Sequence, residues 1–310
     1  MEYTHVPVLL NEAIEGLNIK PSGVYVDCTM GGAGHSSEIL KRLNKDGFLY
    51  CFDQDEYAIY RGQLVLNTIS PNYKIIPDNF VRIKSQLNDL EVMQVDGILY
   101  DLGVSSFHFD MGDRGFSYNY DAILDMRMDT KQSLTAKTIV NTYSFSDLKH
   151  IFFKYGEEKF SASIAKKIVE TRSKKPIETT FELSEIIKSS IPAYARRTGG
   201  HPAKKVFQAL RIAVNDELNV FEKSLREATT LLKKGGRIVV ITFHSLEDRI
   251  CKNLFKEMVE VNIPRGVPIK DKDIKREFRL INNKVIIPSK EEVLKNNRSH
   301  SAKMRILEKI

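Results

Sequence analysis

A chain of 310 residues that is 42% hydrophobic and 28% charged is long enough to bury a large core, and its formal net charge of +7 favours an anionic partner. No run of about 18 apolar residues is present, and the first residues lack a basic segment followed by an apolar one, so we expect a cytoplasmic protein without membrane spans or a secretory signal. The three cysteines, Cys28, Cys51 and Cys251, and the scattered acidic residues show no disulfide or metal-ligand spacing, and we assign no metal site.

The first hundred residues alternate short β-rich runs with helical patterns, which predicts a parallel sheet with crossover helices. Four strands are expected, each ending in polar or acidic residues, with helices between the early ones. The expected strands are 24–28, 47–53, 73–76 and 95–102, and the expected helices are 36–43 and 57–66. In an open sheet of this kind ligands bind outside the carboxyl ends of the strands.

After Asp101 the alternation stops and helical patterns take over. Helix-capping patterns at Ser144-x-x-Asp147 and Thr179-x-x-Glu182 open two of these helices. A long amphipathic helix is then expected over 203–233, followed by strands at 237–243, 277–287 and 302–307. We therefore expect a sheet domain built from 1–111 and 201–310, interrupted by an inserted helical domain at 112–200.

The segment from Asp27 to His35 leaves the first strand and enters a helix. Its small residues allow backbone N–H groups to approach a ligand closely, which suits a nucleotide-like cofactor. Asp53, at the end of the second strand and roughly twenty residues beyond the glycines, is placed where a carboxylate binds the two hydroxyls of a ribose.

Two cofactor classes share this geometry. A dinucleotide site places pyrophosphate at the helix N-terminus, and the carboxylate of Asp27 would repel that anion. The same carboxylate suits the amino-acid end of S-adenosylmethionine and its nearby sulfonium charge, so we favour a methyl donor. A nicotinamide-dependent oxidoreductase remains an alternative, and a tight turn without a ligand is a third interpretation.

Eight segments in a fixed order carry a family resemblance. They are the segments that begin at His5, Asp27, Asp101, Asp113, Phe207, Val214, Phe243 and Arg298. In these segments the chain resembles the bacterial family of ribosomal RNA small subunit methyltransferases H, also called MraW. The resemblance implies a class I, Rossmann-like S-adenosylmethionine-dependent methyltransferase sheet with an inserted all-helical RNA-binding domain. It also implies N4-methylation of a cytosine in the decoding region of small-subunit (16S) ribosomal RNA.

The resemblance implies a set of cofactor-binding residues, to which we add Asp27. The implied residues are Ala33, Gly34, His35, Asp53, Phe80, Asp101 and His108. Around the last of these, Phe107-His108-Phe109 departs from the Pro-Gln-Leu that the family shows.

Methylation of an exocyclic amine needs no covalent enzyme intermediate and therefore no catalytic cysteine. The enzyme must align the amine with the methyl group and provide an acceptor for an amine proton. Asp101 is the first candidate for this acceptor, and Asn215 and His244 are two further catalytic candidates. A capped polar face for Asn215 and a structural histidine at a strand end for His244 carry equal weight.

Basic residues interleaved with Tyr194 and His201 indicate an RNA-binding surface, with a solvated surface as the alternative. The residues expected to contact RNA are Arg114, Arg196, Arg197, Lys204 and Lys205. The expected partner is small-subunit ribosomal RNA or the assembled small subunit, bound by a monomer or homodimer. A non-catalytic RNA-binding assembly factor remains an alternative function.

Overall fold

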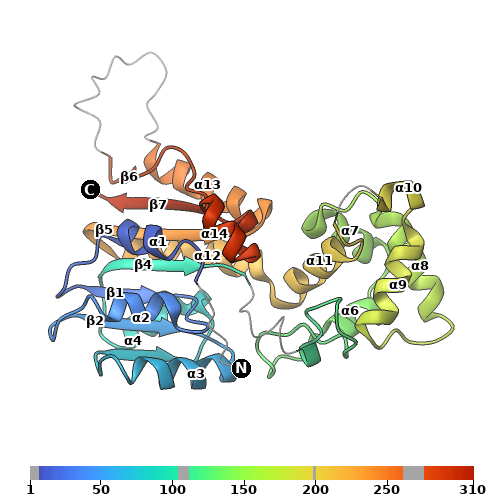
Figure 1. Cartoon of the computed structure of the whole chain (residues 1–310), viewed down its shortest axis with the longest axis horizontal. Helices are drawn as coiled ribbons and strands as arrows, with labels where there is room; N and C mark the ends of the chain where they lie inside the picture. Colours follow the sequence, from blue (N-terminus) through green and yellow to red (C-terminus); the bar gives the residue numbers. More distant parts are fainter. Residues whose placement is uncertain (1–6, 104–111, 198–199, 261–275) are drawn as a thin grey trace, which may run out of the picture. The chain divides into compact units, whose positions relative to one another are not determined.

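The computed structural model describes residues 7–103, 112–197, 200–260 and 276–310. The expected cofactor residue His108 lies outside the described residues. The chain forms two compact units, one of Met1–Gly103 with Leu218–Ile310 and one of Val104–Glu217 (Figure 1). The helical unit therefore includes residues 201–217, which the sequence pattern had assigned to the sheet domain.

The first unit contains a seven-stranded sheet in the order β3-β2-β1-β4-β5-β7-β6 (Figure 1). Its strands are β1 (Val24–Asp27), β2 (Phe48–Phe52), β3 (Tyr73–Ile76), β4 (Val95–Asp101), β5 (Leu232–Thr242), β6 (Phe278–Leu280) and β7 (Lys303–Lys309). The strands from β3 through β5 pair in parallel, whereas β7 runs antiparallel to both β5 and β6.

The order of the strands places a topological switch point beside β1. The chain moves outward from β1 to β2 and β3, and then returns to the other side of β1 as β4. Ligands of open α/β sheets bind at such a point, at the carboxyl ends of the strands. Residues that follow β1, β2, β3 and β4 therefore share the edge where a ligand is expected.

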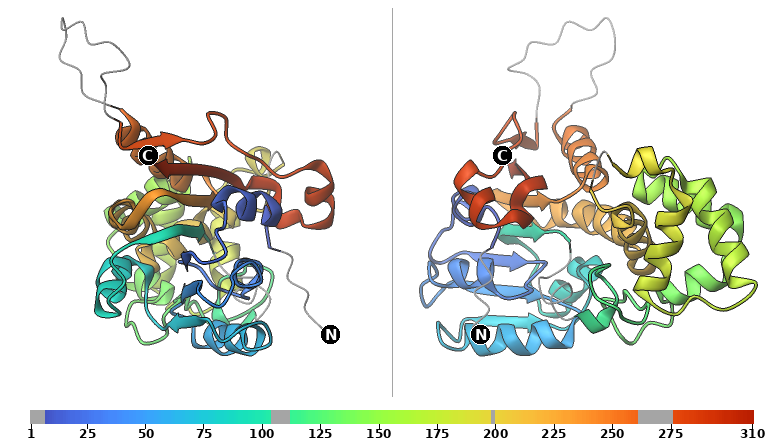
Figure 2. Two further views of the ribbon diagram at one scale, coloured as in Figure 1. Left: turned by 90° about the vertical axis from the view of Figure 1, so that its left-hand side faces the viewer. Right: turned by 45° about the vertical axis from the view of Figure 1, so that its right-hand side comes forward.

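Helices cover both faces of the sheet (Figure 2). One face packs against α1 (Leu10–Leu17), α2 (Gly34–Leu40) and α3 (Glu56–Leu66), and the other packs against α4 (Ile83–Asp89), α12 (Glu217–Leu231) and α13 (Ser245–Val259). Both faces of the central strands are buried, which explains why the sequence of β4 is a nearly continuous apolar run. Two short helices, α14 (Lys290–Lys295) and the 3₁₀ helix η4 (Asn297–Ser301), precede β7.

The single helix expected over 203–233 is wrong. Helix α11 (Lys204–Asn215) ends at Asp216, which adopts a left-handed conformation with φ 49° and donates its N–H to the carbonyl of Ile212. Helix α12 begins at the next residue, and β5 starts at Leu232, earlier than expected. Apolar periodicity continues across the break because both helices bury one face, so it gave no sign of the turn.

The helical unit has a core of its own. It contains the 3₁₀ helix η2 (Gly112–Arg114) and α6 (Ala136–Thr142), α7 (Phe145–Gly156), α8 (Ser161–Arg172), α9 (Thr180–Ser190), α10 (Ala193–Arg196) and α11. Phe152, Ile164, Leu183 and Leu210 are among its fully buried residues. Thr179 and Glu182 form the expected capping box at the start of α9. No helix in the described part of the chain is long and apolar enough to cross a membrane.

Candidate active site

Asp27 ends β1 with a carboxylate that is almost completely buried. Its Oδ2 accepts a hydrogen bond from Ser36 Oγ at 2.6 Å, and its Oδ1 accepts one from the N–H of Thr29 at 3.0 Å. Burial raises the pKa of Asp27, and the hydrogen bonds from Ser36 and Thr29 oppose that rise only in part. The strand therefore ends in a carboxyl group held in place by its own turn.

The turn after β1 has little room for side chains. Ala33 is buried and left-handed, with φ 61°, and its N–H donates to Met30 O at 2.7 Å. A Cβ on Gly34 would lie 2.2 Å from Pro7 Cγ, which is closer than any real contact. The close approach to Pro7 therefore explains why glycine follows Ala33 at the start of α2.

Asp53 ties this turn to the end of β2. Its Oδ2 accepts the N–H of Gly31 at 2.8 Å, and its Oδ1 accepts the N–H of Asp55 at 2.9 Å. A carboxylate has about four acceptor positions, and these two hydrogen bonds use one on each oxygen. The carboxylate thus shapes the turn after β1.

Asp101 ends β4 beside Asp27. Its N–H donates to Thr29 Oγ1 at 2.7 Å, which joins the ends of β1 and β4. Its Oδ1 is buried and has no hydrogen-bond partner in the described structure. Burial raises the pKa of Asp101 well above its ordinary value, and the charges of Asp27 and Glu247 raise it further. A cation at this position would relieve both effects.

His35 on α2 lies between the backbone carbonyl of Val8 and the carboxyl group of Asp101. Its Nε2 is 3.1 Å from Val8 O, and its Nδ1 is 3.5 Å from Asp101 Oδ2. A carbonyl oxygen only accepts, so Nε2 carries the hydrogen of a neutral ring and Nδ1 has a lone pair. In this tautomer a hydrogen bond between Nδ1 and Asp101 Oδ2 would need a proton on the carboxyl group or on Nδ1.

Phe80 follows β3, at the start of the 3₁₀ helix η1 (Phe80–Arg82), and is held from two sides. Its ring meets Tyr100 edge to face at 5.6 Å, and its carbonyl accepts from Ser224 Oγ at 2.8 Å. Ser224 Oγ also bonds the Tyr100 hydroxyl at 2.7 Å. The supporting roles of Ser224 and Thr29 were not predicted. The sequence signal for Ser224 was a polar residue on the buried, apolar face of α12.

His244 is the N-cap of α13. Its Nδ1 accepts the N–H of Glu247 at 3.4 Å, and Glu247 Oε2 accepts the N–H groups of His244 and Phe243 at 3.2 and 2.8 Å. His244 Nε2 lies 3.1 Å from Glu247 Oε1, outside hydrogen-bonding geometry. This capping box is the structural role weighed against catalysis in the sequence analysis.

The sequence comparisons identify the family. Residues 2–310 match the model of the MraW methylase family. The chain is also 54% identical over 311 residues to the ribosomal RNA small subunit methyltransferase H of Streptococcus dysgalactiae subsp. equisimilis, covering 100% of this chain and 98% of that one. The chain belongs to the MraW methylase family. It is therefore a class I methyltransferase in fold, and its methyl donor is S-adenosylmethionine.

Solved structures also resemble this MraW methylase. An rRNA methylase from Streptococcus thermophilus is 12% identical, with a TM-score of 0.42 over 97% of this chain and 93% of that chain. A methyltransferase homologue from Pyrococcus horikoshii is 12% identical, with a TM-score of 0.45 over 97% of this chain and 66% of that chain. Both scores lie below 0.5, so the family assignment rests on the sequence matches.

Asn215 lies in the helical unit of the methylase, and its amide is fully engaged. Its Oδ1 accepts the N–H of Met128 at 2.8 Å, and its Nδ2 donates to Met126 O at 2.8 Å and to Arg211 O at 2.9 Å. Met126 has a left-handed backbone with φ 62°, so the amide braces a strained bend. These contacts give Asn215 a structural task.

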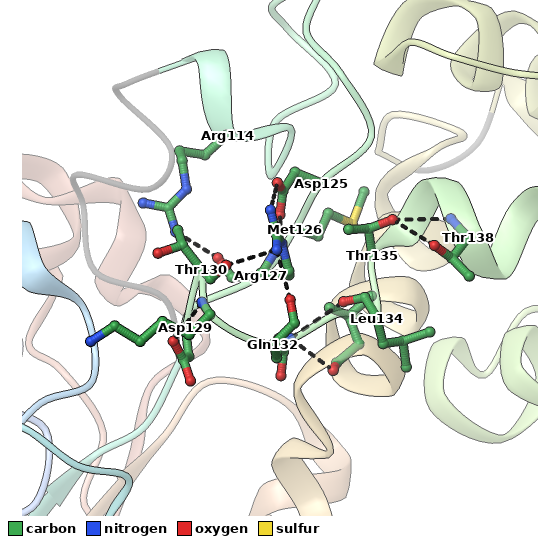
Figure 3. Close-up of polar contacts among 12 residues, drawn as sticks. Arg114, Asp125, Met126, Arg127, Asp129, Thr130, Gln132, Leu134, Thr135 and Thr138 are labelled. Atoms are coloured by element: carbon green, nitrogen blue, oxygen red, sulfur yellow. Dashed lines mark hydrogen bonds and ion pairs between the residues drawn. The ribbon is translucent and has the colours of Figure 1, made fainter.

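Arg114 takes part in the same loop, which Figure 3 shows in close-up. Its guanidinium donates to Arg127 O at 2.6 Å, while the Arg127 guanidinium grips the Asp125 carboxylate and donates to the carbonyls of Thr130 and Gln132. Arg114 therefore holds loop backbone in this structure, in addition to any contact with RNA.

The other residues expected to bind RNA are exposed. Arg196 and Arg197 lie on α10 and just after it, and Lys204 and Lys205 begin α11. Lys205 Nζ donates to Glu157 O at 3.0 Å. Tyr194, two residues before Arg196 in α10, is 73% exposed. Basic and aromatic groups are thus exposed on this unit.

Proposed function

We propose that this protein transfers a methyl group from S-adenosylmethionine to the N4 amine of a cytosine in the decoding region of small-subunit (16S) ribosomal RNA, in the cytoplasm. The family membership and the name of the 54% identical relative support the substrate. The observation that carries the chemistry is a pair of carboxylates at the switch point of the sheet: Asp27, which is buried, and Asp101, which is partly buried and has a buried Oδ1.

The described residues fit the methyl donor. S-adenosylmethionine has an ammonium and a sulfonium charge, and a cation stabilises ionised carboxylates whose pKa values burial has raised. When bound, the donor supplies an electrophilic methyl group. Asp27 and Asp101 would hold its positive end, with Ala33, Gly34 and His35 at the turn, Asp53 at the ribose and Phe80 at the adenine; His108 belongs to the same proposal.

Asp101 is the proton acceptor that we propose. The cytosine amine gains an N–C bond and releases one proton, and Asp101 Oδ1 is a buried oxygen with no described partner to compete for that proton. His35, against Oδ2, keeps the carboxyl oriented. The capping role of His244 and the bracing role of Asn215 leave both as secondary catalytic candidates.

The substrate base must leave its stack before its amine can meet the methyl donor. We infer that RNA with an accessible loop, as naked RNA or in a partly assembled small subunit, is the partner. Arg114, Arg196, Arg197, Lys204 and Lys205 would contact its phosphates. The protein would act as a monomer or a homodimer.

Mass spectrometry of small-subunit RNA tests this function directly. RNA from cells that lack the protein should lose one N4-methylcytosine, and the purified protein with S-adenosylmethionine should restore it. Asp101→Asn should reduce the transfer rate about 10²- to 10⁴-fold, the usual effect of losing a general base. Retained RNA binding without any transfer by the unaltered protein would instead favour a non-catalytic assembly factor.

A further inference from the structure

Three aromatic rings form a continuous stack in the helical unit. Tyr118 and His201 lie parallel, with ring centroids 4.2 Å apart and an interplanar angle of 4°. Tyr118 also contacts Phe207, whose ring meets it edge to face with the centroids 5.6 Å apart. Phe207 is buried in the helical core, Tyr118 is half-buried and His201 is exposed. The stack therefore runs from the core to the surface.

The outermost ring has a fixed orientation. His201 Nδ1 accepts the N–H of Ala203 at 3.2 Å, and its carbonyl accepts the N–H of Lys204 at 3.0 Å. Since Nδ1 accepts, the hydrogen of the neutral ring is on Nε2. Burial and then the charge of Lys188 lower the pKa of His201, against a smaller opposing effect of Glu185, which favours this neutral form.

The chain that flanks this ring is basic and exposed. Arg196 and Arg197 precede His201, and Lys204 follows it at the start of α11. None of these three side chains forms an ion pair with another described residue. Proteins hold single-stranded RNA by stacking a base on an exposed ring and neutralising nearby phosphates with cations, and here a supported, neutral, exposed ring has cations on either side of it in the sequence.

We propose that the outer face of His201 stacks on an unpaired base of the RNA substrate while Arg196, Arg197 and Lys204 neutralise neighbouring phosphates. This inference rests on the proposed function, because it assigns a contact to the same substrate. Tyr118 and Phe207 act as the support that keeps the ring in place before RNA arrives, and a preorganised ring loses less conformational freedom on binding.

Two substitutions at one position separate stacking from the hydrogen bond to Ala203. His201→Phe keeps a ring on Tyr118 but loses the acceptor, whereas His201→Asn keeps an acceptor but loses the ring. Binding to a fluorescein-labelled, unpaired oligocytidylate should weaken about 5- to 150-fold for His201→Asn, as expected for one lost stacking contact. It should change less than about 2-fold for His201→Phe. Cooperative thermal unfolding of both variants, at melting temperatures close to that of the unaltered protein, is the control for folding.

Equal weakening of both variants, or no weakening of either, would overturn the stacking proposal. Salt dependence provides a separate check. His201→Asn should keep the slope of log affinity against log salt concentration, while Arg196→Gln and Lys204→Gln should each reduce it by about 0.7, the value for one phosphate contact on a single strand. An unchanged slope in both glutamine variants would remove the phosphate contacts from the proposal.

Steady-state transfer to small-subunit RNA keeps this inference distinct from the function. His201→Asn should raise KM for RNA and leave kcat at saturating RNA within about 2-fold, with unchanged calorimetric affinity for S-adenosylhomocysteine. An unchanged KM, with active unaltered protein, overturns the stacking contact alone. Absence of transfer by the unaltered protein on its RNA overturns the proposed function instead.

Discussion

Asp101 and His35 meet at the carboxyl edge of the sheet, with Oδ2 of the aspartate 3.5 Å from Nδ1 of the histidine. The hydrogen bond between His35 Nε2 and Val8 O fixes which ring nitrogen faces the carboxyl group. His35 is buried and Asp101 is partly buried, and a cation beside the carboxyl group would favour its ionised form. The pair thus connects donor binding to the state of the proposed proton acceptor.

The rate of methyl transfer should depend on the ionisation of Asp101. Because burial and the charges of Asp27 and Glu247 raise its pKa, kcat/KM should rise with pH through that raised value and then level off. Asp101→Asn should be slow and should lack this rise. The profile of kcat/KM between pH 5 and pH 9, about the range accessible to such assays, tests this. A rise that persists in Asp101→Asn would assign it to another group.

Asp101→Asn should also stabilise the protein when no donor is bound. The pKa of Asp101 is higher in the folded than in the unfolded state, so its contribution to folding stability is complete at acidic pH and is lost as the pH rises through the folded pKa. Near neutral pH the uncharged amide of asparagine avoids the cost of ionising a carboxyl group at this position. The melting temperature of Asp101→Asn should therefore rise by about 2–4 °C, more at pH 8 than at pH 6.

Asp248 supplies a control of opposite sign. Its burial would raise its pKa, but Arg305 at 2.8 Å and Lys303 at 3.2 Å hold that pKa below its ordinary value. The stability that ionised Asp248 adds to the folded state is present above its unfolded pKa and is lost as the pH falls through its folded pKa. Asp248→Asn should therefore lower the melting temperature at neutral pH. Equal shifts in both variants would contradict the electrostatic account of Asp101.

Gly34→Ala should disturb the turn after β1. The new Cβ would stand 2.2 Å from Pro7 Cγ, and relief of such overpacking costs about 1–3 kcal/mol. Urea unfolding should show this loss, and calorimetry should show weaker binding of S-adenosylhomocysteine. Gly200→Ala is the matched control, because a Cβ there meets nothing within 4 Å. Similar effects of both alanines would exclude the contact with Pro7 as the cause.

Asn215→Asp separates a bracing role from a catalytic one. The aspartate keeps an acceptor for the N–H of Met128 but loses the donors to Met126 O and Arg211 O. We expect a loss of about 1–3 kcal/mol in the free energy of unfolding and unchanged affinity for the donor. Urea unfolding and calorimetry measure these two quantities. A loss of kcat of more than about 100-fold with unchanged stability would indicate catalysis.

Much of the sheet was predictable because its central strands are buried on both faces. Such strands leave apolar runs that end in acidic residues, and this pattern located β1, β2 and β4 and the turn after Asp27. The break at Asp216 was not predictable, since one left-handed residue hardly changes the apolar period. The inserted unit consequently extends to Glu217, which composition did not reveal.

The residues at the carboxyl edge were identified individually, but their contacts were not. Local sequence places Asp101 and His35 at a strand end and a helix start, whereas their meeting depends on the strand order that sets β4 beside β1. Thr29 and Ser224 have no motif, because a single hydroxyl acquires its role only from the backbone or ring that folding brings to it.

The double use of Asp53 limits how the donor pocket can be redesigned. One carboxylate anchors the bend after β1 through Gly31 and is also the group proposed to recognise the ribose. Substitutions of Asp53 intended to accept a donor analogue with an altered sugar would therefore be poorly tolerated, since each would disturb the loop as well as the contact with the sugar. Phe80 is a better starting point for engineering, because Ser224 holds its main chain independently of its ring.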